Sequence, residues 1–281
     1  MITPAHEPPR VALVTGAGSG IGAAAAEALS SAGWQVVICG RRAEALEAVA
    51  AATGAVPLIA DVTAPEVPRR LVEQTVERFG HLDGLVLNAG IVRPGTTGEL
   101  TDEDWQAQLD TNLTAPFALT RAALPHLIER SGAVVGVASV SALRASGGTV
   151  GYNVTKAGLS MLMQSVAVDH GPAGVRANVV CPGWTRTEMA DEEMAELGKE
   201  RGLDVEKSYG LATAVLPTPR PADSAEIASV ITWLLSPGAS YINGAVIPVD
   251  GGLTAVDVGG LCFDPRVSIA ASAHGADSLG R

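Results

Sequence analysis

The sequence predicts an α/β domain in which a doubly wound parallel sheet of about seven strands carries helices on both faces. Short, β-branched apolar runs alternate along the chain with longer segments whose apolar residues recur at helical spacing. The 281 residues include 32 glycines and are 47% hydrophobic and 17% charged, which provides a large core with many tight turns. With no internal repeat and no linker, residues 1–252 are expected to form one domain.

The first expected strand and the turn after it predict a phosphate-binding loop. Residues 10–15 are apolar and β-branched, and an alanine-rich helix follows the glycine cluster TGAGSGIG. Gly16 permits a sharp turn, while Gly20 and Gly22 let the backbone and the helix approach a pyrophosphate closely. The helix N-terminus then offers free N–H groups to the anion. In this position the cluster favours a dinucleotide site over an ordinary turn.

The second expected strand, residues 34–40, indicates which dinucleotide is bound. In dinucleotide-binding folds the tip of this strand meets the adenosine ribose. No acidic residue is present to accept hydrogen bonds from both ribose hydroxyls, and Gly40 with Arg41 leaves space and charge for a 2′-phosphate. Alternatively, Arg41 and Arg42 only solvate the start of the next helix, which is expected to run to about residue 52.

The middle of the chain supplies three more strands and the helices between them. Strands are expected over residues 56–60, 83–87 and 133–139, and an amphipathic helix is expected over 63–79. Residues 102–130 predict one long helix or two abutting helices, with Asn112 in the middle. Because asparagine competes for backbone hydrogen bonds inside a helix, exposure to solvent is its ordinary explanation there.

The last third of the chain supplies two strands, a helix and a long connection. The strands are expected over 175–181 and 245–249, and the helix over 223–236 begins with a capping box of Asp223 and Glu226. Residues 184–221 are polar, proline-punctuated and too long for an ordinary connection, which predicts a mobile lid over a substrate. Residues 253–281 form a C-terminal extension, flexible from about residue 270.

Charge and cysteine content exclude several classes of function. The net charge of −11 argues against a nucleic-acid partner and an anionic membrane surface. Cys39, Cys181 and Cys262 form no C-x-x-C pair, so neither a disulfide framework nor a metal site is expected, and the first two are predicted to be buried. Residues 1–10 lack an apolar signal region, and no run approaches 18 apolar residues. A cytoplasmic protein is therefore expected.

A tyrosine and a lysine four positions apart, Tyr152 and Lys156, lie on one face of an expected helix. A free phenol titrates near pH 10, and a nearby ammonium lowers its pKa. A pKa of about 7 requires roughly 4 kcal/mol, which a lysine and a cationic cofactor ring could supply. Alone, such a pair is more often an ordinary surface feature. The carboxyl ends of parallel strands share one edge, however, and the expected strands end at Gly16, Asp61, Asn88, Ser139 and Pro182.

In this order and spacing, the motifs resemble the short-chain dehydrogenase/reductase family over residues 10–252, a family with a Rossmann-type fold. The matching pieces are TGAGSGIG, Asp61-Val62, Asn88-Ala89-Gly90, Asn112, Ser139, Tyr152-x-x-x-Lys156, the segment 182–187 and Asp250-Gly251-Gly252. Ser139, rather than Ser141, matches the catalytic serine because it precedes Tyr152 by thirteen residues.

The resemblance implies a catalytic tetrad of Asn112, Ser139, Tyr152 and Lys156. Tyr152 would give a proton to a carbonyl oxygen or remove one from an alcohol, and Ser139 would hold that oxygen. Lys156 would lower the phenol pKa and bind the nicotinamide ribose. Asn112 would hold a water that links Lys156 to solvent.

The predicted cofactor is NADP, with NAD as the alternative. Its site would comprise the glycine loop, both arginines and the residues that the resemblance adds: Gly16, Ser19, Gly20, Ile21, Gly22, Arg41, Arg42, Asp61, Val62, Asn88, Ala89, Gly90, Tyr152, Lys156, Pro182, Gly183, Thr185 and Thr187. Three departures from the family pattern, Leu87, Gly136 and Ala138, remove no group of the tetrad. Ser19 stands where NADP enzymes more often carry arginine, so the preference rests on Gly40-Arg41-Arg42.

The function expected from these residues is a carbonyl reductase or alcohol dehydrogenase for a small or medium, largely apolar ketone or secondary alcohol. The substrate would lie against Ser139, Ser141, Arg144, Tyr152, Trp184 and Met189. An NAD-linked alcohol or sugar dehydrogenase and a catalytically silent dinucleotide-binding protein are the alternatives. The resemblance suggests a homotetramer, or a homodimer, in which the helices near Asn112 and Tyr152 pack across an interface.

Overall fold

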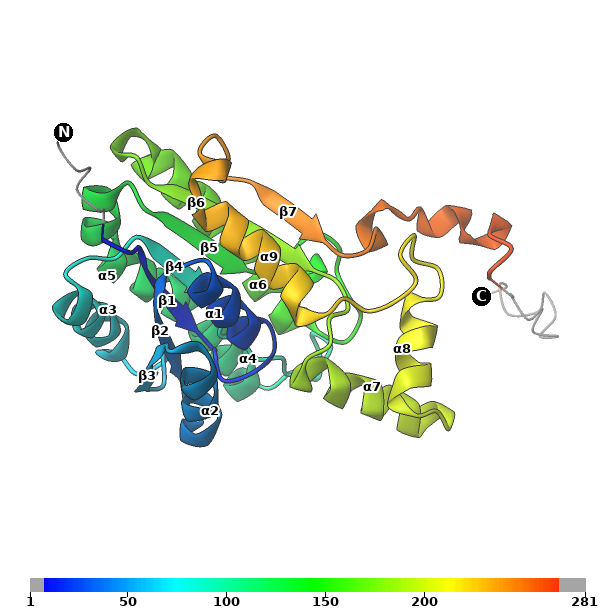
Figure 1. Ribbon diagram of the computed structural model, residues 1–281. Coiled ribbons are helices and arrows are strands. Elements are labelled where there is room, and N and C mark those ends of the chain that lie inside the picture. The colour runs from blue at the N-terminus through cyan, green and yellow to red at the C-terminus, as the bar shows by residue number, and fades with distance from the viewer. Residues whose placement is uncertain (1–7, 268–281) are drawn as a thin grey trace, which may run out of the picture.

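A seven-stranded parallel sheet runs through residues 8–267, the part of the chain that the computed structural model describes (Figure 1). Its strand order is β3-β2-β1-β4-β5-β6-β7, and every neighbouring pair is parallel. The strands are β1 (Val11–Thr15), β2 (Gln35–Gly40), β3 (Val56–Ile59), β4 (Gly84–Leu87), β5 (Ala133–Val137), β6 (Arg176–Pro182) and β7 (Val246–Val249). The first three strands extend the sheet in one direction from β1, and the chain then returns past β1 so that β4 to β7 extend it in the other direction. This reversal confirms the predicted doubly wound fold.

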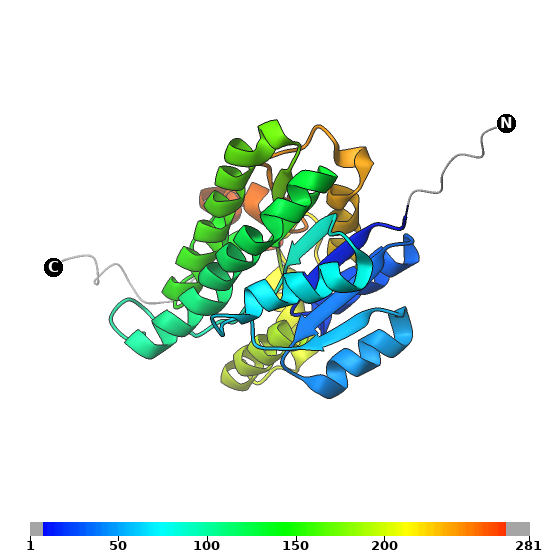
Figure 2. The ribbon, with the colours of Figure 1, turned by 90° about the vertical axis from the view of Figure 1, so that its left-hand side faces the viewer.

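Helices cover both faces of the sheet and bury one apolar cluster on each. On one face lie α1 (Gly20–Ser31), α2 (Ala43–Thr53) and α9 (Ser224–Leu235), and on the other lie α3 (Val67–Phe79), α5 (Ala115–Arg130) and α6 (Val150–His170). Figure 2 shows the second face, with α5 and α6 side by side. In β1, Val11 and Leu13 join one cluster while Ala12 and Val14 join the other. The strand is therefore apolar on both faces, as a central parallel strand must be.

The capping box at the start of α9 is confirmed. The Glu226 carboxylate accepts a hydrogen bond from the Asp223 backbone N–H at 2.9 Å, and the Asp223 side chain caps the first turn in return. Two otherwise unpaired N–H groups at the helix start are thereby satisfied.

The predicted helical segment 102–130 is two helices joined by a π-helical turn. Helix α4 (Asp102–Leu109) is followed by the turn at Asp110–Thr114 and then by α5. Asn112 lies in this turn with 0% of its surface exposed. The expectation that solvent exposure explains this asparagine is therefore wrong, and its side chain has buried partners instead.

The predicted lid segment, residues 184–221, contains two helices, α7 (Glu188–Arg201) and α8 (Val205–Thr213), which project beside the sheet (Figure 1). The side chains of Thr187 and Asp204 accept hydrogen bonds from the backbone N–H groups of the first turns. A small cluster of Ala190, Met194 and Tyr209 packs between the helices. This local core stabilises helices that are otherwise polar, and the expected role of the segment as a lid stays a prediction.

After β7, residues 253–267 form two 3-10 helices, Leu253–Ala255 and Val258–Phe263. The Arg266 guanidinium donates to the carbonyl oxygens of Leu216 and Val215, which ties the extension to the loop after α8. The predicted flexible tail from residue 270 lies outside the described residues. Cys39 and Cys181 are buried, as predicted. None of the helices between residues 8 and 267 has the length and apolar character that crossing a membrane requires.

Candidate active site

The glycine turn after β1 is packed so closely that side chains are excluded. Gly16 has a φ of 65°, and a methyl group on Gly22 would lie 2.4 Å from the Gly16 carbonyl oxygen. A methyl group on Gly16 itself would lie 2.8 Å from the α-carbon of Ala89. The first turn of α1 thereby packs closely against the loop.

Thr15, which sequence reasoning misses, holds the ends of β1 and β4 together. Its hydroxyl accepts hydrogen bonds from the backbone N–H groups of Asn88 and Ala89, both at 3.1 Å, and donates to the Val86 carbonyl at 3.2 Å. The Asn88 amide donates in return to the carbonyl oxygens of Thr15 and Gly16 at 3.0 Å. The only signal for Thr15 in the sequence is its place immediately before the first glycine.

The start of α1 fits the phosphates of a dinucleotide. Its N-cap, Ser19, makes no side-chain hydrogen bond to the helix, and the first turn carries no acidic residue. The N–H groups of this turn and the positive end of the helix dipole are therefore available to an anion. Gly20, Ile21 and Gly22, all predicted to border the cofactor, lie in this turn, and Gly16 lies in the loop before it.

At the tip of β2, the two predicted arginines are placed differently. The Arg42 guanidinium donates to the Ser19 hydroxyl at 2.8 Å and pairs with the Glu188 carboxylate at 2.7 Å. Arg41 is exposed, and its charge lowers the Asp61 pKa. The Asp61 pKa is lowered mainly by the backbone N–H of Thr63. Val62 is buried beside it. Sequence reasoning misses Glu188, which is distant in the chain and belongs to α7.

Asn112 connects three segments of the predicted site. Its Oδ1 accepts from the Ile91 N–H at 2.8 Å, and its Nδ2 donates to the Ile91 carbonyl at 2.9 Å and to the Thr155 hydroxyl at 3.1 Å. Both amide hydrogens are used in these contacts, so only a lone pair of Oδ1 remains for the predicted water. The π-helical turn, the loop after β4 and α6 are thereby held in one arrangement.

Lys156 is almost fully buried, with 4% of its surface exposed. Its Nζ donates to the Val137 carbonyl oxygen at 2.9 Å and lies 5.4 Å from the centre of the Tyr152 ring. A methyl group on Gly90 would lie 3.2 Å from Nζ and 3.4 Å from Asn112 Oδ1, so both atoms face Gly90. Burial lowers the Lys156 pKa to about 8.

Tyr152 lies in the first turn of α6, between Lys156 and Ser139. Burial raises its pKa to about 12, although a hydrogen bond with Ser139 acts in the opposite direction. The predicted lowering of this pKa is therefore not found in the chain alone, because desolvation outweighs the stabilising contacts. The phenol is in its protonated form at neutral pH.

The residues predicted after β6 lie at the junction with β7 and the lid. Pro182 ends β6, the Gly183 N–H donates to the Val249 carbonyl at 3.1 Å, and the Thr185 hydroxyl donates to the Gly183 carbonyl at 3.1 Å. A methyl group on Gly183 would lie 2.9 Å from the α-carbon of Asp250. Thr187 caps α7 with its hydroxyl oxygen.

The predicted substrate residues divide into two groups. The Ser141 N–H donates to the Ser139 hydroxyl oxygen at 3.2 Å, which places these two residues together. Met189 lies in the first turn of α7, and Trp184 packs against the small core of the lid. Arg144 contacts neither group of predicted substrate residues. Its side chain is exposed and donates a hydrogen bond to the neighbouring Leu143 carbonyl.

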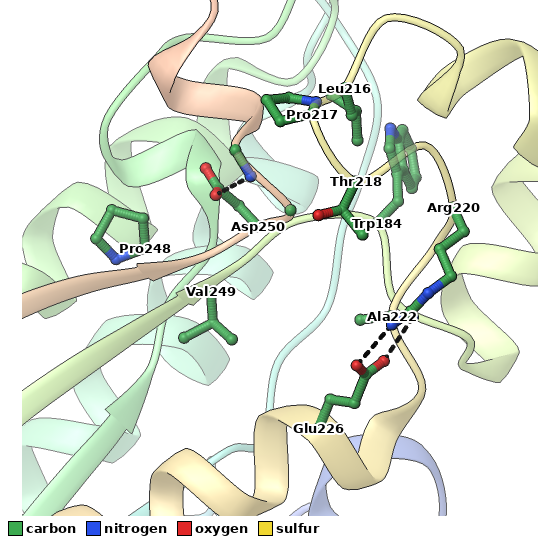
Figure 3. A pocket seen from close by; sticks show the side chains of 12 residues that line it. Trp184, Leu216, Pro217, Thr218, Arg220, Ala222, Glu226, Pro248, Val249 and Asp250 are labelled. Atoms are coloured by element: carbon green, nitrogen blue, oxygen red, sulfur yellow. Dashed lines mark hydrogen bonds and ion pairs between the residues drawn. The ribbon is translucent and has the colours of Figure 1, made fainter.

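A cavity of about 500 Å³ lies between the loop after α8 and the end of β7 (Figure 3). Trp184 and Thr218 are among the residues that line it, and so are Arg220 and Glu226, which form an ion pair. None of the four tetrad residues lines this cavity. It is therefore formed by the lid segment and the end of β7 and does not include the predicted reacting groups.

Comparison with known proteins gives matches over nearly the whole chain. A family model described as "Enoyl-(Acyl carrier protein) reductase" matches residues 16–254. The protein MoaE of Klebsiella aerogenes is 42% identical over 264 residues, which cover 90% of this chain and 99% of MoaE. A crystal structure of levodione reductase superposes with a TM-score of 0.85 at 34% identity, covering 89% of this chain and all of that one. A variant of actinorhodin polyketide ketoreductase with NADPH superposes with a TM-score of 0.83 at 32% identity, covering 88% and 98%.

Proposed function

Because this chain belongs to the short-chain dehydrogenase/reductase family, whose members are NAD(P)-dependent oxidoreductases, we propose that it reduces a ketone to a secondary alcohol with NADPH. The relatives include enzymes named as reductases of levodione, of 3-oxoacyl-[acyl-carrier-protein] and of a polyketide. The observation that carries the proposal is the position of the Lys156 ammonium, beside the Tyr152 ring and facing Gly90 together with Asn112 Oδ1.

In this proposal Tyr152 is the acid that protonates the carbonyl oxygen. A phenol whose pKa is raised to about 12 by burial holds its proton at neutral pH, which is the form that reduction requires. Ser139 would hold the same carbonyl oxygen with its hydroxyl. Oxidation of an alcohol would instead need the phenolate as the base, and reduction is proposed as the direction because cells generally keep NADP in its reduced form.

Lys156 and Asn112 would assist Tyr152 without donating the proton to the substrate themselves. The Lys156 ammonium would stabilise negative charge on the phenol as its proton leaves, and it would hold the ribose next to the nicotinamide. The remaining lone pair of Asn112 Oδ1 faces Gly90 beside Nζ, where a water could pass a proton to Lys156. The bound cofactor supplies the hydride, while the protein supplies orientation and one proton donor.

The proposed preference for NADP rests on the tip of β2. Gly40 carries no carboxylate to bind both ribose hydroxyls, and exposed Arg41 with Arg42 supplies positive charge for a 2′-phosphate. The remaining proposed contacts are the start of α1 for the pyrophosphate, Asp61 and Val62 for adenine, and the ends of β4 and β6 for the nicotinamide half. An NAD-linked alcohol or sugar dehydrogenase is the alternative, favoured by the Glu188 carboxylate that already pairs with Arg42.

The proposed substrate is a small or medium, largely apolar carbonyl compound. It would enter between the loop that carries Ser141 and the first turn of the lid helix, where Trp184 and Met189 supply apolar surface. Arg144, exposed at the rim, would meet an acidic group if the substrate has one. The whole of residues 1–252 would act as one domain with residues 184–221 as its lid.

We further propose a homotetramer, with a homodimer as the alternative, in the cytoplasm. Exposed apolar side chains lie on the paired helices α5 and α6, which are the helices expected at an interface: Phe117, Val154, Met161 and Val168. Large apolar groups gathered on one face are typical of a surface that another protein covers. Sedimentation would separate the tetramer and the dimer from a monomer.

Replacement of Tyr152 by phenylalanine tests the proposal. With a panel of ketones, quinones and 3-oxoacyl thioesters and NADPH oxidation as the readout, Tyr152→Phe should lower kcat by about 100-fold or more. Because the ring is kept, the Kd for NADPH should stay within about two-fold. Tyr241→Phe, at a fully exposed tyrosine, is the matched control and should leave both unchanged. Unchanged turnover in Tyr152→Phe would remove the proposed acid, and nucleotide binding without turnover of any substrate would favour a silent binder.

A further inference from the structure

The start of the lid helix α7 lies directly on the glycine loop. A methyl group on Gly20 would lie 2.9 Å from Cγ2 of Thr187, the N-cap of α7. The next residue, Glu188, is the first of the helix and extends toward Ser19 and Arg42. The lid therefore touches the predicted phosphate site as well as the predicted substrate site.

Glu188 contacts two of the polar side chains that this corner offers to an anion, Ser19 and Arg42. Its Oε2 accepts from the Ser19 hydroxyl at 3.1 Å and pairs with Nη2 of Arg42 at 2.7 Å, while the same Nη2 donates to Ser19 at 2.8 Å. This hydrogen bonding lowers the pKa of Glu188 and raises that of Arg42. The Glu188 carboxylate thus pairs with Arg42, the guanidinium that the proposed function assigns to the 2′-phosphate of the nucleotide.

A phosphate and the Glu188 carboxylate cannot share Arg42 without cost. A phosphate bound to the guanidinium would place its negative charge close to the Glu188 carboxylate, and like charges that share one partner repel each other. The side chains of Arg42 and Glu188 are 58% and 59% exposed, so the ion pair is a weak one that a ligand of higher charge can displace. A nucleotide with a neutral 2′-hydroxyl would meet no such competition.

We propose that Glu188 is a specificity-determining residue that competes with the phosphate of a 2′-phosphorylated coenzyme for Arg42 and Ser19. The inference rests on the proposed function, because it assumes that a dinucleotide binds along the glycine loop. It deepens that function in two ways. Glu188 lowers the preference for NADP over NAD, and its displacement releases the start of α7 when NADP binds. Coenzyme identity is thereby coupled to the position of the lid.

The test measures equilibrium binding of NADP⁺, NAD⁺ and 2′,5′-ADP by calorimetry, without substrate. Glu188→Gln keeps the size of the side chain and removes its charge. It should tighten NADP⁺ and 2′,5′-ADP by about three- to ten-fold and change NAD⁺ by less than about two-fold. Glu196→Gln is the matched control, because Glu196 lies exposed on the same helix in an ion pair with Lys199 and not with Arg42. It should change none of the three.

A second readout follows the lid. Trypsin cleavage at Lys199 and Arg201, near the end of α7, should become faster in the wild type when NADP⁺ is added, and NAD⁺ should have less effect. In Glu188→Gln the cleavage should already be fast without nucleotide.

The outcomes separate this inference from the proposed function. If the wild type binds NADP⁺ but Glu188→Gln leaves its affinity unchanged or weaker, the competition is refuted while the function stands. An equal gain for NADP⁺ and NAD⁺ also refutes it, because the effect would then not involve the 2′-phosphate. If neither dinucleotide binds to the wild type, the proposed function fails and this inference fails with it.

Discussion

The Asn112 amide nitrogen lies 3.1 Å from the Thr155 hydroxyl, and this bond joins the π-helical turn to α6 one residue before Lys156. The two further bonds of Asn112 to the Ile91 backbone fix the loop that carries Gly90. A single buried amide thus sets the distance between the proposed tetrad residues and the end of β4.

Asn112→Ala should lower the free energy of unfolding by about 3 kcal/mol, because it removes three hydrogen bonds and leaves the half-buried backbone groups of Ile91 without their side-chain partner. Urea denaturation measures this change. Gln106→Ala, which removes an exposed amide bonded to Asp110, is the control and should cost less than about 0.5 kcal/mol. Equal, small losses in both variants would show that the Asn112 network contributes no stability.

Lys156 should make stability depend on alkaline pH. Burial lowers its pKa to about 8 from an ordinary 10.5, so the unfolded chain binds more protons between these values. Below pH 8 the folded protein carries the full free-energy cost of burying the charged ammonium. As the pH rises to 10.5 the buried lysine loses its proton and this cost disappears. The shift from 10.5 to about 8 corresponds to about 3 kcal/mol of unfolding free energy. Relative to Lys156→Met, the wild type should therefore gain about this much unfolding free energy between pH 8 and 10.5.

Urea unfolding of both proteins across this range measures the effect, and other titrating groups cancel in the difference. Lys207→Met, at an exposed lysine paired with Asp204, should give a curve parallel to that of the wild type. A parallel curve for Lys156→Met would contradict the prediction.

Two glycines should respond to alanine in opposite directions. In Gly22→Ala the methyl group would lie 2.4 Å from the Gly16 carbonyl oxygen and 2.5 Å from Asn88 Nδ2, so the loop must deform. We expect a loss of about 1–3 kcal/mol in unfolding free energy and at least about ten-fold weaker dinucleotide binding. In Gly210→Ala the methyl group meets no atom beyond α8 itself, and the higher helix propensity should add about 0.5–1 kcal/mol.

Thermal denaturation and calorimetric titration of NADP⁺ test this pair. Weak binding in Gly22→Ala together with normal binding in Gly210→Ala would locate the effect in the loop. If Gly22→Ala binds normally, the loop relaxes without loss and the close packing is not required for the site.

Thr15→Val should destabilise the protein although it preserves the volume of the side chain. The backbone N–H groups of Asn88 and Ala89 would lose their common acceptor inside the protein, at a cost of about 2–4 kcal/mol. Thr15→Ser keeps the hydroxyl and should recover most of this loss. Chemical denaturation measures both variants, and similar stability of valine and serine at this position would show that the hydroxyl is not needed.

The sequence predicts the strands well because each is an apolar run bounded by a glycine, a proline or a polar residue. Gly16, Asn88 and Pro182 mark strand ends that share one edge of the sheet, and the structure places all three there. The capping residues Asp223 and Glu226 identify the start of α9 for the same reason, since the signal is local.

The partners of individual side chains could not be predicted in this way. Asn112 has no local signal that distinguishes exposure from burial, because its partners Ile91 and Thr155 are distant in the chain. Glu188 lies beside Ser19 and Arg42 because the lid segment folds back to the glycine loop, and this return is not visible in the sequence. The lid helices in turn depend on a small core around Tyr209, which contains too few apolar residues to give a clear sequence pattern. The pKa of Tyr152 depends on desolvation, which spacing along a helix does not reveal.

The strand order has a consequence for how the chain is made. Ala12 of β1 pairs with Val36 early in synthesis, but its second neighbour, Gly84 of β4, leaves the ribosome much later. Throughout that interval a strand that is apolar on both faces has one unpaired edge. Such an edge is the point at which a nascent chain is captured by chaperones or associates with its own copies, so the arrival of β4 is the step that ends this exposure.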